Sequence, residues 1–191
     1  MAQDFDRLEP KHIAFIKRQH LFFTASAAAS GHINISPRST ALFRVLDPET
    51  VCYLDLTGSG NETAAHLLAD GRMTILFTAL SGPPLILRLY GRGVVLGRGE
   101  PGYEALRADA FAGPEPQGAR QIVQLQLSHV KSSCGYGVPL MQYEGERDTL
   151  ERWTDSKGED GIRTYWEKKN LESMDGFDTG MRARLSKTPK P

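Results

Sequence analysis

The stretch TVCYLDLTGSGNETAAHL, residues 50–67, joins a run of β-forming residues to a run with helical character. Its first seven residues are rich in Thr, Val, Tyr and Leu, which predicts a strand over residues 50–56. The pattern Ser59-x-x-Glu62 matches a capping box and predicts a helix with Ser59 as its N-cap. Gly71 is the residue expected just beyond the end of that helix. Two glycines therefore lie where a strand meets the N-terminus of a helix.

The loop between this strand and this helix has the chemistry of an anion-binding site. Its glycines leave backbone N–H groups uncovered, and the helix dipole adds partial positive charge at the same end. Ser59, Asn61 and Thr63 add side-chain donors that suit a phosphate group. Asp55 and Glu62 argue against an anion unless their carboxylates point away from it. The alternative is a capped helix start after a tight turn, with no ligand, and the pattern alone leaves both interpretations open.

Five further segments have the composition or the alternation of strands: residues 21–27, 31–36, 72–80, 85–96 and 122–130. Gly91 and Gly93 mark a bend or a bulge in the fourth of these segments. Helical patterns cover residues 10–19, with Pro10 at the first helical position, and residues 102–111. Six strands with few helices and short connections predict a mainly β (α+β) fold, an antiparallel barrel or sandwich.

Composition argues against several classes of protein. The 23 Lys and Arg residues balance 23 Asp and Glu residues, whereas a nucleic-acid-binding domain usually carries a basic excess. No apolar run approaches the roughly 20 residues of a membrane helix, and the N-terminus lacks the apolar segment of a signal peptide. Cys52 and Cys134 lie far apart and outside any CxxC motif, which predicts free thiols and no metal site. We therefore expect a cytoplasmic protein.

Changes in composition and sequence pattern divide the chain into three regions. Residues 1–20 carry an N-terminal helix, residues 21–131 form the barrel domain, and residues 132–191 form an extension with short helices and a basic tail. The tail is expected to be disordered or draped over another surface. Trp153 and Trp166 both lie in the extension, and such large aromatic side chains need a surface to pack on. That surface is the barrel or a partner subunit.

Three segments together resemble a known family: GHINISPRS (residues 31–39), the opening stretch, and RMTILFTALSGPPLILRLYG (residues 72–91). Over about residues 21–95 their order, spacing and strand content resemble the pyridoxamine 5′-phosphate oxidase-like, FMN-binding split-barrel proteins. The later segments CGYGVP and YWEKKNLESMDG are similar to the extension of an uncharacterised branch of that family. The resemblance implies a six-stranded antiparallel split β-barrel with flanking helices. It also implies a homodimer with FMN at the subunit interface.

The resemblance further implies a set of cofactor-binding positions. The phosphate and ribityl chain would lie against the second and third strands and the start of the following helix, and the strand that carries Arg88 would face the flavin. The implied residues are Asn34, Ser36, Pro37, Arg38, Ser39, Thr57, Gly58, Ser59, Gly60, Asn61, Glu62, Thr63 and Arg88.

These positions depart from the pattern of true pyridoxamine phosphate oxidases. The family motifs RxVLLK, SRK and RQVR correspond here to NISPRS, NET and LILR. Asn34 and Ser39 therefore replace the Arg and Lys that would hold the phosphate, and only Arg88 is retained. We expect FMN binding in which Arg38 or neutral donors hold the phosphate, and we do not expect oxidation of pyridoxamine phosphate.

Two functions remain open at this point. The first is a flavin-dependent oxidoreductase, in which the cofactor carries the redox chemistry and no side chain stands out as a catalytic acid or base. The second is a non-catalytic carrier of a flavin, or a split barrel that holds haem or a deazaflavin. Haem would need an axial ligand, and the candidates are His32, His66 and His129. His66 is expected at the surface or edge of its helix, and Cys134 is expected to be an inert thiol.

Overall fold

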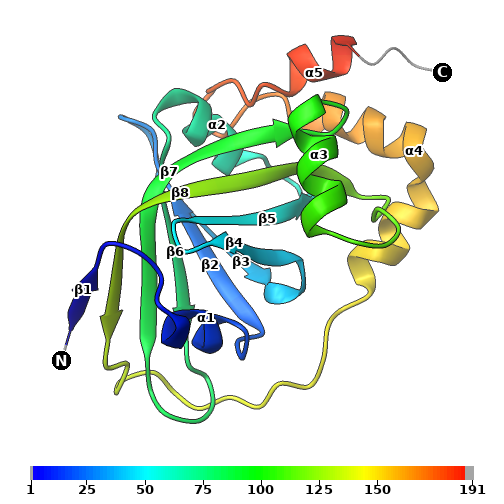
Figure 1. Cartoon of the computed structure of the whole chain (residues 1–191). Helices are drawn as coiled ribbons and strands as arrows, with labels where there is room; N and C mark the ends of the chain where they lie inside the picture. The colour runs from blue at the N-terminus through cyan, green and yellow to red at the C-terminus, as the bar shows by residue number, and fades with distance from the viewer. Residues whose placement is uncertain (1, 188–191) are drawn as a thin grey trace.

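The structure is a computed structural model, and it describes residues 2–187 of the chain (Figure 1). Its strands are β1 (Gln3–Phe5), β2 (Leu21–Ser26), β3 (Asn34–Ser39), β4 (Phe43–Asp47), β5 (Thr50–Leu56), β6 (Arg72–Thr78), β7 (Ile86–Gly97) and β8 (Ala119–Ser133). Its helices are α1 (Pro10–Ile16), α2 (Glu62–Ala69), α3 (Pro101–Ala110), α4 (Thr149–Lys169) and α5 (Met181–Lys187), with a 3₁₀ turn, η1 (Thr40–Leu42), between β3 and β4.

The strands form one antiparallel sheet in the order β3-β2-β6-β7-β8-β5-β4, and β1 adds to β8. Figure 1 shows the sheet curling into a half-closed barrel, so that β3 comes to face β5 across the open side. An ion pair between Arg38 of β3 and Asp55 of β5 bridges this opening. All six predicted strands are present, and the predicted split-barrel fold is confirmed. The structure adds β1 and β4, which the sequence analysis missed.

The apolar core lies on both sides of β5. Val51 and Tyr53 belong to the cluster inside the barrel, together with Phe22, Leu89 and other residues of β2, β6, β7 and β8. Cys52 and Leu54 face the opposite way, into a second cluster under α3. A strand that is buried on both faces has a nearly continuous apolar sequence, as β5 does. The strand β5 therefore packs against apolar clusters on both of its faces. Its end carries Asp55 and leads into residues 57–61, which we call the glycine loop.

The bulge predicted at Gly91 is confirmed. The register between β7 and β8 shifts between Tyr90 and Gly91. A Cβ atom at position 91 would lie 1.9 Å from the backbone oxygen of Gln126. Only glycine allows the two backbones to approach this closely.

Two helix boundaries differ from the sequence patterns. Helix α1 begins at Pro10 as predicted but ends at Ile16. The N-cap of α2 is Asn61, with Glu62 as the first helical residue, so the predicted capping box with Ser59 as N-cap is wrong. The carboxylate of Glu62 instead accepts hydrogen bonds from the backbone N–H of Met174. Gly71 follows the helix with a φ of +90°, as expected of a C′ glycine.

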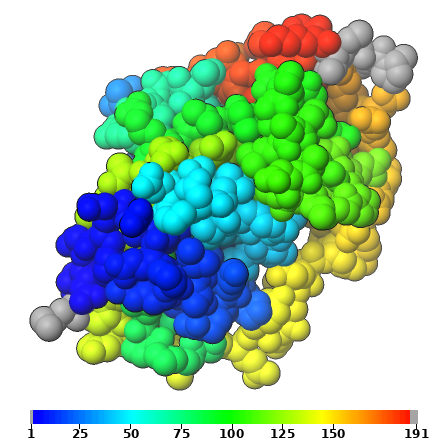
Figure 2. Space-filling view, viewed as in Figure 1, coloured from blue at the N-terminus to red at the C-terminus, as the bar shows by residue number. Residues whose placement is uncertain are grey.

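The extension packs against the barrel of its own chain. Figure 2 shows its orange and red segments in contact with the green ones. Ile162 and Trp166 of α4 form an apolar cluster with Met181 and Leu185 of α5, so the segment predicted as a disordered or draped tail is an ordered helix as far as residue 187. The last residues of that tail, 188–191, lie outside the described residues. Within residues 2–187, no helix has both the length and the apolar character needed to cross a membrane, and the cytoplasmic location stays a prediction.

Candidate functional site

Two cavities meet on the open side of the barrel, where β3 faces β5. The larger one, the apolar cavity, has a volume of about 830 Å³ and is walled by side chains such as Phe22, Leu54 and Leu56. The smaller one, the polar cavity, has a volume of about 560 Å³. The two cavities share the lining residues Pro37, Arg38, Leu56 and Gly58, so they lie side by side.

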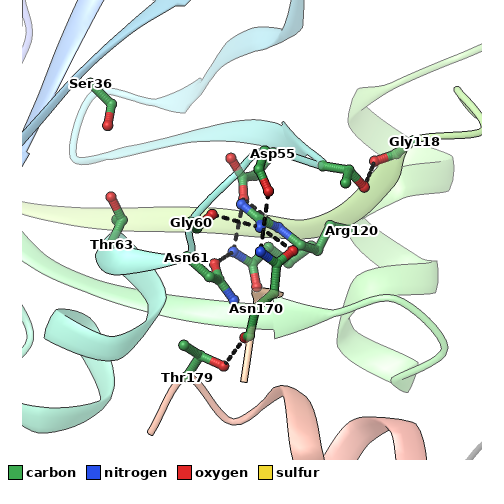
Figure 3. Close-up of polar contacts among 12 residues, drawn as sticks. Ser36, Asp55, Gly60, Asn61, Thr63, Gly118, Arg120, Asn170 and Thr179 are labelled. Carbon is green, nitrogen blue, oxygen red and sulfur yellow. Dashed lines mark hydrogen bonds and ion pairs between the residues drawn. The ribbon is translucent and has the colours of Figure 1, made fainter. Parts of the chain in front are cut away.

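The structure gathers most of the predicted cofactor residues around the polar cavity. Those that line it are Asn34, Ser36, Pro37, Arg38, Gly58, Ser59, Gly60, Asn61, Glu62 and Thr63. Ser39 and Thr57 line the apolar cavity instead. Arg88 lines neither, because it lies on β7, where its guanidinium donates to the Ser133 hydroxyl at 3.0 Å. The hydroxyl groups of Ser36 and Thr63 point toward each other across the polar cavity (Figure 3).

A buried carboxylate with two arginine partners forms the floor of the polar cavity (Figure 3). The side chain of Asp55 is 1% exposed. One of its oxygens accepts from Arg38, and the other accepts from Arg120 Nη2 at 2.7 Å and from Gln121 Nε2 at 2.8 Å. Burial by itself would raise the pKa of Asp55, but the charges of Arg120 and Arg38 outweigh it and lower that pKa to about 2. One negative charge therefore faces two positive charges, which leaves a net charge of +1 at neutral pH.

The same network fixes the glycine loop from below. Arg120 Nη1 donates to the backbone oxygen of Gly60 and to Asn170 Oδ1, both at 2.9 Å. Gln121 Nε2 also donates to Asn61 Oδ1 at 2.8 Å. Sequence reasoning missed Arg120 and Gln121. One signal in the sequence was available: these two polar residues stand at the start of a strand in which polar and apolar residues alternate. A polar side chain that is buried in such a strand needs a hydrogen-bond partner, because burial without one is costly.

The two carboxylates that argued against an anion are both engaged elsewhere. Asp55 is neutralised by arginines, and both oxygens of Glu62 lie 3.1–3.2 Å from the backbone nitrogen of Met174. The Asn61 side chain makes no capping hydrogen bond to the first turn of α2, and its Nδ2 atom is buried without a hydrogen-bond partner. Donors at the start of α2 therefore remain for a ligand with acceptor oxygens.

The histidines and cysteines lie away from both cavities. His66 is 1% exposed, with its Nδ1 atom 3.0 Å from the Ser26 hydroxyl, so its expected surface position is wrong. The adjoining residues of α2, from Thr63 to Leu67, are buried as well. His129 pairs with Asp4, and His32 pairs with Asp175. Among residues 2–187, no histidine or cysteine lines the two cavities, so a haem bound there would find none of the candidate axial ligands.

The extension is hydrogen-bonded to the strand end that carries the site. Trp166 Nε1 donates to the Thr57 hydroxyl at 2.8 Å, and that hydroxyl donates to the backbone oxygen of Gly118 at 2.9 Å. Asn170 Nδ2 donates to the backbone oxygen of Gly58 at 3.1 Å. The C-terminal end of α4, with its C-cap Asn170, therefore holds Thr57 and Gly58 in place.

Trp166→Phe is expected to lower the free energy of unfolding by about 1 kcal/mol more than Trp153→Phe, because only Trp166 donates a buried hydrogen bond to the barrel. Trp153 is a matched control, since it lies in the same extension, before the kink of α4 at Gly158, and packs edge-on against Tyr165. Urea denaturation of the two variants measures the difference. Equal losses would show that the Trp166–Thr57 contact contributes nothing to the docking of the extension.

Comparisons with known proteins agree with this fold. The sequence profile of the family described as pyridoxamine 5′-phosphate oxidase matches residues 8–134. The pyridoxamine 5′-phosphate oxidase family protein ustO of Aspergillus flavus is 34% identical over 184 residues, which cover 86% of this chain and 74% of that protein.

Two solved structures share the fold at low sequence identity. A single-residue variant of HupZ of Group A Streptococcus has a TM-score of 0.51 and 21% identity, and the match covers 65% of this chain and 98% of that chain. A putative pyridoxamine 5′-phosphate oxidase of Lactobacillus delbrueckii has a TM-score of 0.51 and 17% identity, with 66% and 94% covered. Most of the extension, including α4 and α5, lies beyond the residues that match the family profile.

Proposed function

This chain belongs to the pyridoxamine 5′-phosphate oxidase family, and on that premise we propose that it binds FMN and acts as a flavin-dependent oxidoreductase. The observation that carries the proposal is that two unlike cavities lie side by side. The wall of one is mostly apolar, with charged residues such as Glu115 and Arg147 among its lining, and the other has a positive floor beside the N-terminus of a helix. A ligand that fills both has a large apolar body and one anionic end, as FMN does.

The residues of the polar cavity fit a phosphate group. Backbone N–H groups of the glycine loop and the first turn of α2 are placed to donate to phosphate oxygens, and the helix dipole favours the negative charge. Arg38 and Arg120 supply the net positive charge that Asp55 leaves uncompensated. Arg38 thus takes the part of the missing family Arg and Lys. Asn34, Ser36 and Thr63 add neutral donors at the wall.

The apolar cavity suits the flavin ring and the substrate next to it. A bound flavin would supply the ability to accept and release a hydride or electrons. The side chains of the protein would bind and orient the flavin and the substrate and keep water out of the cavity. Burial raises the pKa of Tyr53 in this wall to about 12, so its hydroxyl stays protonated at neutral pH. Glu115, another wall residue, is paired with Arg98 at 2.8 Å.

The homodimer with FMN at the subunit interface is also part of the proposal. It is supported by the outer face of β3, an edge strand of the sheet. Ile33 is 73% exposed and Ile35 is 65% exposed, beside the polar cavity that Asn34 and Ser36 line. Apolar side chains exposed on a sheet edge are typical of a surface that pairs with another chain.

Titration of the purified protein with FMN tests this function. We expect saturable quenching of flavin fluorescence, followed by bleaching of the flavin absorbance when a reduced nicotinamide is added without oxygen. A protein that binds no FMN would contradict the flavin proposal. A protein that binds FMN but is reduced by no donor would be a flavin carrier, and a Soret band in the purified protein would point to haem.

A further inference from the structure

The connection between α4 and α5, residues 170–180, forms a loop of fixed shape, which we call the C-terminal loop. Thr179 closes its base: the hydroxyl donates to the backbone oxygen of Asn170 at 2.6 Å (Figure 3), and the backbone N–H donates to Leu171. At its tip, the N–H of Ser173 donates to the backbone oxygen of Phe177 at 2.9 Å. Gly176, with a φ of +80°, completes the turn. The loop therefore holds its own conformation.

The tip of the C-terminal loop is anchored on two other elements. The carboxylate of Asp175 accepts from the backbone N–H of His32 at 2.8 Å and lies 2.7 Å from His32 Nδ1, on the connection between β2 and β3. The N–H of Met174 donates to Glu62 at the start of α2. A Cβ atom at Gly31 would lie 2.5 Å from Asp175 Oδ2, so the glycine leaves room for this contact. The tip thus contacts both the connection between β2 and β3 and the start of α2.

The tip of the C-terminal loop lies at the wall of the polar cavity. Met174 and Glu62, whose carboxylate accepts from the Met174 N–H, both line the polar cavity and do not line the apolar one. Asp175 does not line the polar cavity, because both of its carboxylate oxygens face His32. Asp175 is therefore the anchor of the tip, and Met174 is the side chain that the tip adds to the cavity wall.

We propose that the C-terminal loop makes the site selective for a flavin monophosphate over FAD, an inference that rests on the proposed flavin function. One phosphate fits between the helix start and the arginines. FAD would need room for a second phosphate and an adenosine, and Met174, held in the cavity wall by the contacts with Glu62 and His32, would restrict that room. The loop lies outside the residues that match the family profile, so this selectivity belongs to the extension.

Titration with FMN and FAD in parallel, followed by flavin fluorescence, tests the inference. We expect the unmodified protein to bind FMN at least about tenfold more tightly than FAD. The double variant Met174→Gly, Asp175→Ala removes the barrier and its anchor, and should bind FAD about tenfold more tightly than before, so that its preference for FMN is lost. Glu172→Gln is a matched control, because this exposed carboxylate of the same loop pairs with Arg182 away from the cavity.

The outcomes separate the two proposals. If neither flavin binds, the proposed function fails. If FMN and FAD bind the unmodified protein equally, the flavin function stands and the selectivity of the loop is refuted. If the double variant keeps the unmodified preference for FMN, the loop is not the selective element. If it loses FMN affinity with an unchanged unfolding midpoint, the loop is a ligand of the phosphate and not a barrier.

Discussion

Asp55→Ala is expected to lower the free energy of unfolding by about 3–5 kcal/mol, the loss typical when one partner of a buried ion pair is removed. The substitution leaves Arg120, whose side chain is 3% exposed, without a counter-charge, and it frees Arg38 on the far side of the barrel opening. The Gln121 amide loses an acceptor as well. Urea denaturation at pH 7 measures the effect.

Asp70→Ala is the control for this substitution. Asp70 also pairs with an arginine, Arg72, at 2.7 Å, but the Arg72 side chain is 64% exposed, so water screens the charges of this pair. We expect little change in stability for this variant. Equal losses for the two variants would mean that the buried network does not hold the barrel opening together.

Acid should remove part of the same stabilisation. The pKa of Asp55 is about 2 in the folded protein, below the value of about 3.9 for an exposed aspartate. A carboxylate with a lowered folded-state pKa stabilises the fold above pH 4, and this contribution is lost as the pH falls toward 2. The shift corresponds to roughly 2 kcal/mol. The stability difference between the unmodified protein and Asp55→Asn should therefore shrink by about that amount between pH 5 and pH 2.

Local sequence patterns predicted those parts of the fold that local forces decide. Alternation and β-forming residues located the six longer strands, and Gly91 marked the bulge. Strand β1 was missed because its three residues gain their pairing from β8, more than a hundred residues away. The start of α2 was misplaced for a similar reason, because Glu62 hydrogen-bonds to Met174 at the far end of the chain and not to a local capping partner.

The residues of the candidate site were likewise predicted only in part. Family resemblance indicated the residues of β3 and the glycine loop, which the structure brings to the polar cavity. It did not indicate Arg120, because Asp55 and Arg120 are 65 residues apart and meet only through the pairing of β5 with β8. The C-terminal loop was missed as well, since its place at the cavity depends on the distant contacts of Asp175 and Met174.

Arg38→Met is expected to weaken FMN binding by about 10-fold to 100-fold, the range that corresponds to the loss of a hydrogen bond to a charged group. Without Arg38, Asp55 and Arg120 balance each other, so the floor of the polar cavity loses its net charge of +1 and no longer offsets Glu62, which also lines the cavity. The fold should survive, because Asp55 keeps its hydrogen bonds from Arg120 and Gln121. Fluorescence titration gives the dissociation constant for FMN.

Riboflavin separates the phosphate contact from any change in the apolar cavity. It lacks the phosphate, so its affinity should be the same for Arg38→Met and for the unmodified protein. Arg88→Met is the second comparison, because Arg88 lines neither cavity of the single chain. If Arg88→Met weakens FMN binding and Arg38→Met does not, the cofactor contacts the strand of Arg88, as the family resemblance implied, and the polar cavity is not its phosphate site.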